Sequence, residues 1–161
     1  MRRRRLLAAL PALATAGCLG VDLPFGNGSD ATELRDLVVR NIHDRPHVVH
    51  LQVEHDGDLV HQESYEVRGM RTVTEDGSTF DVAGGTDVPC AWPTDAGRIV
   101  LRGRVDDRKK WKRLDLGESD ADCLYAKAQV EQDGRLVFLT SARCGEPPGN
   151  RTLCGTNDTT E

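Results

Sequence analysis

The sequence predicts an all-β protein: an Ig-like antiparallel β-sandwich of about seven strands, stapled by disulfides. Short segments of alternating apolar and polar residues recur along the chain, at a spacing of about 8–15 residues. Two pairs of these segments are joined by Asp-Gly, which favours hairpin turns because both residues tolerate positive φ. No window keeps the i, i+3, i+4, i+7 apolar spacing of an amphipathic helix. A closed small barrel is the alternative architecture.

The two hairpins are the most clearly defined elements. Their strands are residues 47–54 with 59–67 and residues 124–130 with 136–139. Asp56-Gly57 and Asp133-Gly134 form the turns, which we expect to contain two residues each. Further short strands are predicted at residues 37–42, 78–82, 98–105 and 111–116.

The first twenty residues have the layout of an export signal. Arg2 to Arg5 form a basic start, and the apolar run over residues 6–16 has the length of a signal-peptide core but is too short to span a bilayer. Small residues precede Cys18, whose thiol can accept a lipid before cleavage. The segment resembles a lipoprotein signal with a lipobox, and Arg3-Arg4-x-Leu6-Leu7 resembles a twin-arginine export core. A plain cleaved signal and a cytosolic protein with a basic tail are the alternatives.

This resemblance implies a chain that is exported and anchored to the outer face of the cell membrane by a lipid on Cys18. We therefore divide the chain into a signal peptide (1–17), a lipid-anchored flexible tether (18–32), a β-sandwich domain (33–154) and a polar tail (155–161). The tether is predicted because its segment is rich in Gly, Asn, Pro and Asp and lacks periodicity.

The charge balance argues against a nucleic-acid partner. Lys and Arg number 21 against 26 Asp and Glu, a formal net charge of −5, and removal of residues 1–17 would take it to −9. Abundant Asp with only four Lys is a pattern associated with high-salt environments. Together with the signal, it makes the chain resemble a small exported haloarchaeal lipoprotein, and residues 36–67 resemble the opening hairpin of Ig-like domains in such proteins. Ala142 and Thr152 replace the immunoglobulin tyrosine, so Ig-like refers to architecture alone.

Four cysteines follow Cys18, and an even number in an exported chain indicates two disulfides. If Asp133-Gly134 is a two-residue turn, Cys123 lies directly opposite Cys144 at a closely spaced pair, which leaves Cys90 to bond to Cys154. A zinc site built from the four thiolates is the alternative, but the C-x2-4-C spacing of such sites is absent.

All five histidines lie within residues 43–61. With a two-residue turn at Asp56-Gly57, His50, His61 and Glu63 share one face of the first hairpin. Two imidazoles and a carboxylate could hold zinc or copper there, which makes a metal-binding extracellular domain the alternative function. The other interpretation is a solvated face.

The sequence lacks the motifs G-x-S-x-G and H-E-x-x-H and a Gly-rich phosphate loop, so we predict no catalytic residues and no cofactor. The predicted function is a non-catalytic binding or cell-envelope module. Five basic residues surround Trp111 in residues 108–113, which could bind an acidic polymer or anionic lipids, unless this is a solvated loop with Trp111 packed inward. Trp92 is expected to pack in the core or a loop. Glycosylation candidates are Asn27, Asn150 and Asn157.

Overall fold

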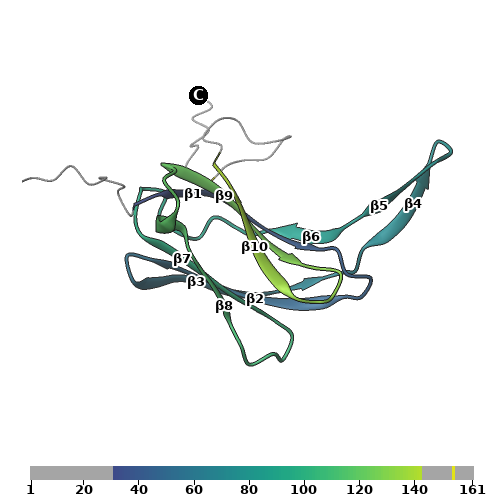
Figure 1. Cartoon of the computed structure of the whole chain (residues 1–161), viewed down its shortest axis with the longest axis horizontal. Helices are drawn as coiled ribbons and strands as arrows, with labels where there is room; N and C mark the ends of the chain where they lie inside the picture. Colours follow the sequence, from purple (N-terminus) through teal and green to yellow (C-terminus); the bar gives the residue numbers. More distant parts are fainter. Residues whose placement is uncertain (1–30, 143–153, 155–161) are drawn as a thin grey trace, which may run out of the picture.

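The computed structural model describes residues 31–142 and Cys154, and the described chain is built almost entirely of strands (Figure 1). The strands are β1 (Glu33–Asn41), β2 (His47–His55), β3 (Asp58–Val67), β4 (Arg71–Glu75), β5 (Ser78–Val82), β6 (Gly84–Asp87), β7 (Ile99–Val105), β8 (Lys112–Asp115), β9 (Cys123–Val130) and β10 (Leu136–Ser141). A 3-10 turn, η1 (Leu116–Glu118), follows β8. Within the described chain, no helix is long and apolar enough to cross a membrane.

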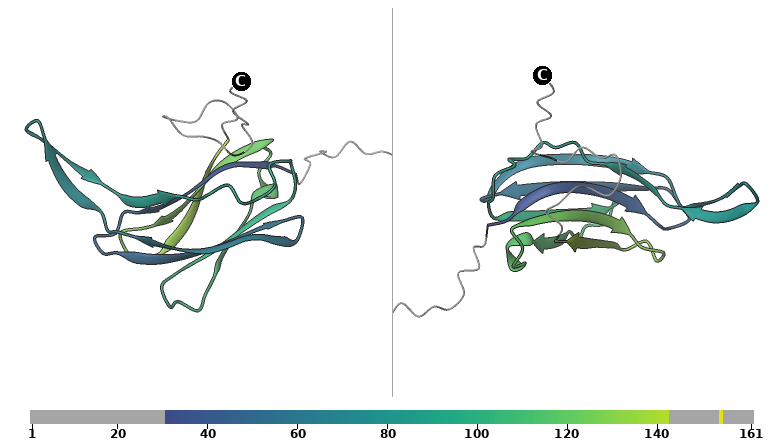
Figure 2. Two further views of the ribbon diagram at one scale, coloured as in Figure 1. Left: turned by 180° about the vertical axis from the view of Figure 1, so that it is seen from behind. Right: turned by 90° about the horizontal axis from the view of Figure 1, so that it is seen from above.

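Two four-stranded sheets pack face to face. One has the order β10-β9-β1-β6, and the other has the order β3-β2-β7-β8. Only β1 and β9 pair in parallel among the strands of residues 31–142, and the remaining pairs are antiparallel. Strands β4 and β5 form a separate hairpin that projects from one end of the sandwich (Figure 2). The predicted all-β sandwich is confirmed.

The core is mainly aliphatic and forms between the two sheets. In β2, alternate residues point inward, and Val49, Leu51 and Val53 are fully buried. The same alternation buries residues of β1, β7 and β9, namely Leu37, Val39, Ile99, Leu101, Val105, Leu124, Ala126, Ala128 and Val130. Trp92 is buried and its indole N–H donates to the backbone oxygen of Leu34 at 2.8 Å, so it belongs to the core as expected.

The first hairpin begins in the predicted register and then leaves it. His55 pairs with Asp58 across the Asp56-Gly57 turn. A β-bulge at Val60 then adds one residue to β3, so that Val53 pairs with His61 rather than with Val60. Because a shift of one residue turns side chains to the other face, the predicted facing pairs beyond the bulge are wrong.

The second hairpin has a three-residue turn instead of the predicted two-residue turn. Val130 pairs with Leu136, and the backbone N–H of Glu131 donates to the Arg135 oxygen at 2.8 Å. Gly134 has φ of 74°, the left-handed conformation that a three-residue turn requires at this position. The register differs by one residue from the one on which the bond between Cys123 and Cys144 was predicted.

The Cys90–Cys154 disulfide is present, with its Cα atoms 5.5 Å apart. The backbone N–H of Cys154 also donates to the oxygen of Arg35 in β1 at 2.9 Å, so this cysteine is fixed against the first sheet. Cys123 is disulfide-bonded as well. Its predicted partner, Cys144, lies outside the described residues, and that pairing remains a prediction.

Candidate functional site

The outer face of the β3-β2-β7-β8 sheet carries an ordered array of polar side chains. Because the inward positions of β2 are buried, the intervening residues His50, Gln52 and Glu54 point outward. Their neighbours on β3, β7 and β8 point the same way, since residues directly opposite each other share a face. We call this surface the polar face; its residues are Gln62, Ser64, His50, Gln52, Glu54, Arg102, Arg104 and Arg113.

One row of the polar face crosses all four strands. Gln62, Gln52, Arg102 and Arg113 are consecutive pairing partners from β3 to β8. The Gln52 amide donates to the Gln62 side-chain oxygen at 2.8 Å, which leaves further amide donors and acceptors facing solvent. A second row contains Ser64, His50 and Arg104, and His50 Nδ1 lies 2.7 Å from Ser64 Oγ.

Arg104 connects the polar face to the turn between β7 and β8. Its guanidinium carbon lies 5.3 Å from the centre of the Trp111 ring, within the range of a cation–π contact. Its Nη1 also donates to the backbone oxygen of Arg108 at 3.4 Å. Trp111 thus lies against an outward-facing arginine and is absent from the core cluster of the described residues, so the expectation of an inward-packed Trp111 is wrong.

Three arginines on or beside the polar face are paired with two carboxylates. Arg102 donates to both oxygens of Glu54, at 2.7 and 3.4 Å. Arg98 and Arg113 both donate to Asp115, at 2.8 and 2.9 Å. The hydrogen bond from Arg98, opposed by burial and reinforced by Arg113, holds the pKa of Asp115 below its ordinary value.

Other cations nearby have no acidic partner. Within residues 31–142, no ion pair involves Arg104, Lys109 or Lys110. The turn that carries the two lysines extends away from both sheets (Figure 1). We call residues 108–111 the basic turn.

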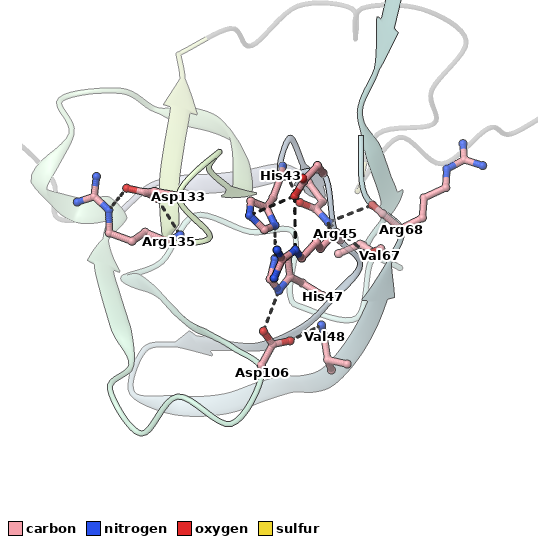
Figure 3. Close-up of polar contacts among 11 residues, drawn as sticks. His43, Arg45, His47, Val48, Val67, Arg68, Asp106, Asp133 and Arg135 are labelled. Carbon is pink, nitrogen blue, oxygen red and sulfur yellow. Dashed lines mark hydrogen bonds and ion pairs between the residues drawn. The ribbon is translucent and has the colours of Figure 1, made fainter. Parts of the chain in front are cut away.

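A second polar cluster joins the basic turn to the start of β2 (Figure 3). Asp106 accepts from the backbone N–H of Val48 at 2.9 Å, and its other oxygen lies 2.8 Å from His47 Nδ1. His47 Nε2 lies 2.9 Å from His43 Nδ1. Because a carboxylate only accepts, His47 Nδ1 donates to Asp106, and a neutral His47 then accepts from His43 at Nε2.

The electrostatics of this cluster favour a charged Asp106. Burial raises the pKa of Asp106, but the Val48 N–H and His47 outweigh it, and the pKa is lowered overall. Asn41 completes the cluster: its amide donates to the Arg45 oxygen at 2.7 Å, and its side-chain oxygen accepts from the His43 N–H at 2.9 Å. These hydrogen bonds connect the β1–β2 loop to the residue that follows β7, which indicates a structural role for the cluster.

The structure does not bring together the three predicted metal ligands. His50 lies on the polar face, whereas the bulge at Val60 turns His61 and Glu63 to the inner side of β3. There the Tyr65 hydroxyl donates to Glu63 at 2.9 Å and lies 2.9 Å from His61 Nε2. Burial and the Glu63 carboxylate raise the pKa of Tyr65. Among the described residues, no three His, Cys, Asp or Glu side chains converge in a way that could hold a metal ion.

The opposite sheet has a hollow of about 510 Å³ on its outer face. Val38, Tyr125 and Leu139 supply apolar surface, and Arg40 and Lys127 supply charge. Nothing in the described structure indicates what would occupy it. The lipidation candidate Cys18 and the glycosylation candidates Asn27, Asn150 and Asn157 lie outside the described residues.

Comparison with known proteins gives no relative from which function can be transferred: no family model, no curated protein and no solved structure matches this chain.

Proposed function

We propose that this protein is an exported, lipid-anchored binding module of the cell envelope. In this proposal the lipid on Cys18 holds the chain at the outer face of the membrane, as the resemblance to haloarchaeal lipoproteins implies, and the polar face binds the ligand. The observation that carries the binding role is the polar row from Gln62 to Arg113, which crosses four strands in register.

The polar face is suited to binding because its groups are held in place before a ligand arrives. With strands about 4.8 Å apart, a row over four strands spans roughly 14 Å. Contacts between side chains already restrict several of these groups, as between Gln52 and Gln62 and between His50 and Ser64, which lowers the conformational entropy lost on binding. Such a surface offers many polar contacts of moderate strength to an extended ligand.

The geometry favours binding over catalysis at this surface. Ser64 and His50 form the one contact on the polar face that resembles a nucleophile and its base. A hydrolytic triad also needs a carboxylate to orient the histidine, and no ion pair involves His50 within residues 31–142. The Ser64–His50 pair therefore serves as a fixed hydrogen-bonding unit.

Anchoring is tested with Cys18→Ser. We expect this variant to leave the membrane fraction for the medium or to remain unprocessed, whereas the parent chain stays with the membrane and carries a lipid on Cys18 by intact mass. An unmodified Cys18 on membrane-bound protein would overturn the anchoring proposal.

Binding is tested by co-sedimentation of the Cys18→Ser protein with isolated cell envelopes. We expect Gln52→Ala and Arg104→Ala to reduce the retained fraction. Lys127→Ala removes a cation from the outer face of the opposite sheet and serves as the matched control. Equal retention of all three variants would show that the polar face is not the binding surface.

A further inference from the structure

We infer that the ligand of the polar face is an acidic polysaccharide, whose carboxylate or sulfate groups are bound by Arg104 and the basic turn while its hydroxyl groups bond to the neighbouring glutamines. This inference rests on the proposed binding function and adds the chemical class of the ligand.

Charge is distributed unevenly over the protein. The chain as a whole carries a formal net charge of −5. At the end of the polar face away from the basic turn, Glu54 and Asp115 are paired with arginines. Beside the basic turn, Asp106 is bonded to His47 and Val48, and the exposed Asp107 offsets one positive charge. The charges of Arg104, Lys109 and Lys110 exceed that of Asp107, so this region is positive on an otherwise acidic protein. A surface of this kind attracts a ligand of opposite charge.

The guanidinium of Arg104 is held in place by its neighbours. The Trp111 ring and the Arg108 oxygen hold its guanidinium on the outer side of the sheet. The Nε of Arg104 is buried and has no hydrogen-bond partner within the described residues, so a ligand from solvent reaches its two terminal Nη groups. A planar guanidinium held in this way can bind carboxylate or sulfate through two parallel hydrogen bonds from these Nη groups.

Neutral polar side chains lie beside these cations. Gln52 and Gln62 occupy the row next to Arg104, and their free amide groups can donate to and accept from sugar hydroxyls. A small anion would use only the cations. A polymer with both charged and hydroxyl groups would use the whole width of the polar face.

A membrane surface fits this region less well. Stable binding at a lipid interface combines electrostatic attraction with apolar side chains that enter the headgroup region. The large apolar side chains most exposed within residues 31–142 are Leu59, Phe80 and Leu139, of which Phe80 lies on the β4–β5 hairpin and Leu139 on the opposite sheet. Leu59 pairs with Glu54 and so shares the polar face, but it lies at the end away from the basic turn and forms no continuous apolar surface with it.

The test uses the soluble Cys18→Ser protein with polygalacturonate, dextran sulfate, neutral dextran and vesicles containing phosphatidylglycerol. We expect binding to one or both acidic polymers and none to dextran or vesicles. Arg104→Ala should weaken binding at least ~10-fold, because it removes the bidentate contact. Lys127→Ala should leave the affinity unchanged.

A second variant tests the basic turn without changing any residue of the sheet. Lys109→Ala/Lys110→Ala changes only exposed residues of the basic turn and should fold normally by circular dichroism. It should reduce the slope of log affinity against log salt by up to about two, roughly one for each lysine that contacts an acidic group. An unchanged slope together with unchanged affinity would overturn the role of the basic turn.

The outcomes separate this inference from the proposed function. Retention on envelopes without binding to either acidic polymer would overturn the polysaccharide assignment and leave the binding function standing. Equal binding to dextran would overturn the requirement for acidic groups, and binding to the vesicles alone would show that the ligand is a lipid surface. Loss of both envelope and polymer binding would overturn both proposals.

Discussion

Asp106 accepts hydrogen bonds from two parts of β2 at once, from the side chain of His47 on one carboxylate oxygen and from the backbone N–H of Val48 on the other. Asp106 itself lies just after β7, at a positive φ of 50°. The carboxylate therefore fastens the start of the β7–β8 turn to the neighbouring strand. This contact positions the basic turn relative to the polar face.

The first prediction concerns this contact. Asp106→Asn leaves one oxygen to serve two donors, so one hydrogen bond to a charged acceptor is lost. We expect the free energy of unfolding to fall by about 1–3 kcal/mol, measured from urea titration. Asp107→Asn, at the exposed neighbouring position, should leave the urea midpoint unchanged. Equal midpoints for the two variants would show that the Asp106 contact does not stabilise the fold.

The second prediction is an acid-dependent loss of stability through Asp115. Hydrogen bonds from Arg98 and Arg113 keep its pKa below the ordinary value of 3.8. A carboxyl with a lowered folded-state pKa stabilises the protein fully above its unfolded pKa, and this contribution is lost as the pH falls through the folded pKa. The free energy of unfolding should therefore decrease as the pH falls below about 4.

Asp115→Asn tests this assignment. The variant should be less stable at neutral pH, and its stability should depend less on pH in the acidic range. Asp58→Asn, which changes an exposed carboxylate, should keep the pH dependence of the parent chain. If the free energy of unfolding of Asp115→Asn fell with decreasing pH as steeply as that of the parent chain, other carboxylates would be the cause of the acid sensitivity.

The third prediction concerns the close approach of the two sheets at Gly103. A Cβ atom at this position would lie 2.6 Å from a methyl carbon of Leu136 and 3.0 Å from the ring of Phe138. Gly103→Ala should therefore overpack the core and destabilise the protein by about 1–3 kcal/mol. Leu136→Val in the same chain should restore part of this loss, measured by thermal unfolding. If the double variant lost as much stability as the two single variants together, residues 103 and 136 would not be in direct contact.

The fourth prediction concerns the disulfides. The Cys90–Cys154 bond closes a loop with a sequence separation of 64 residues and should contribute about 4 kcal/mol in the chain-entropy model. Cys90→Ser should lower the unfolding temperature markedly, and a reducing agent should do the same to the parent chain. Peptide mapping without reduction should recover residue 90 linked to 154, and residue 123 linked to 144. A bond from Cys123 to any other cysteine would show that the second predicted pairing is wrong.

The fold class follows from the sequence because alternation and Asp-Gly turns are local signals. The predicted registers of both hairpins are wrong because one additional residue, in a strand or in a turn, shifts every pair beyond it. The bulge at Val60 has no distinctive residue type, and a Gly in a hairpin turn fits both two- and three-residue turns, so Gly134 alone did not decide between them. Strand β6 was missed because Gly84 and Gly85 weaken the strand pattern.

The polar face could be predicted only in part. The cluster of cations around Trp111 is visible in the sequence. Its relation to Gln52 and Gln62 depends on which residues of β7 face β2, and this pairing joins segments about fifty residues apart. The three candidate metal ligands of the alternative function do not share a face for the related reason that a single inserted residue turns His61 away from the face of His50.

The β4–β5 hairpin and the entry of the chain into β1 lie at opposite ends of the sandwich (Figure 2). With the chain attached to a membrane through Cys18, as proposed, and the tether extended away from the membrane, the hairpin would be the part of the sandwich farthest from the lipid. The strands of the polar face would then run roughly along the membrane normal, so that the face looks sideways along the cell surface. Polymers that lie parallel to the membrane would contact the polar face across its strands. Molecules that arrive from the medium would first contact the hairpin, with the exposed ring of Phe80.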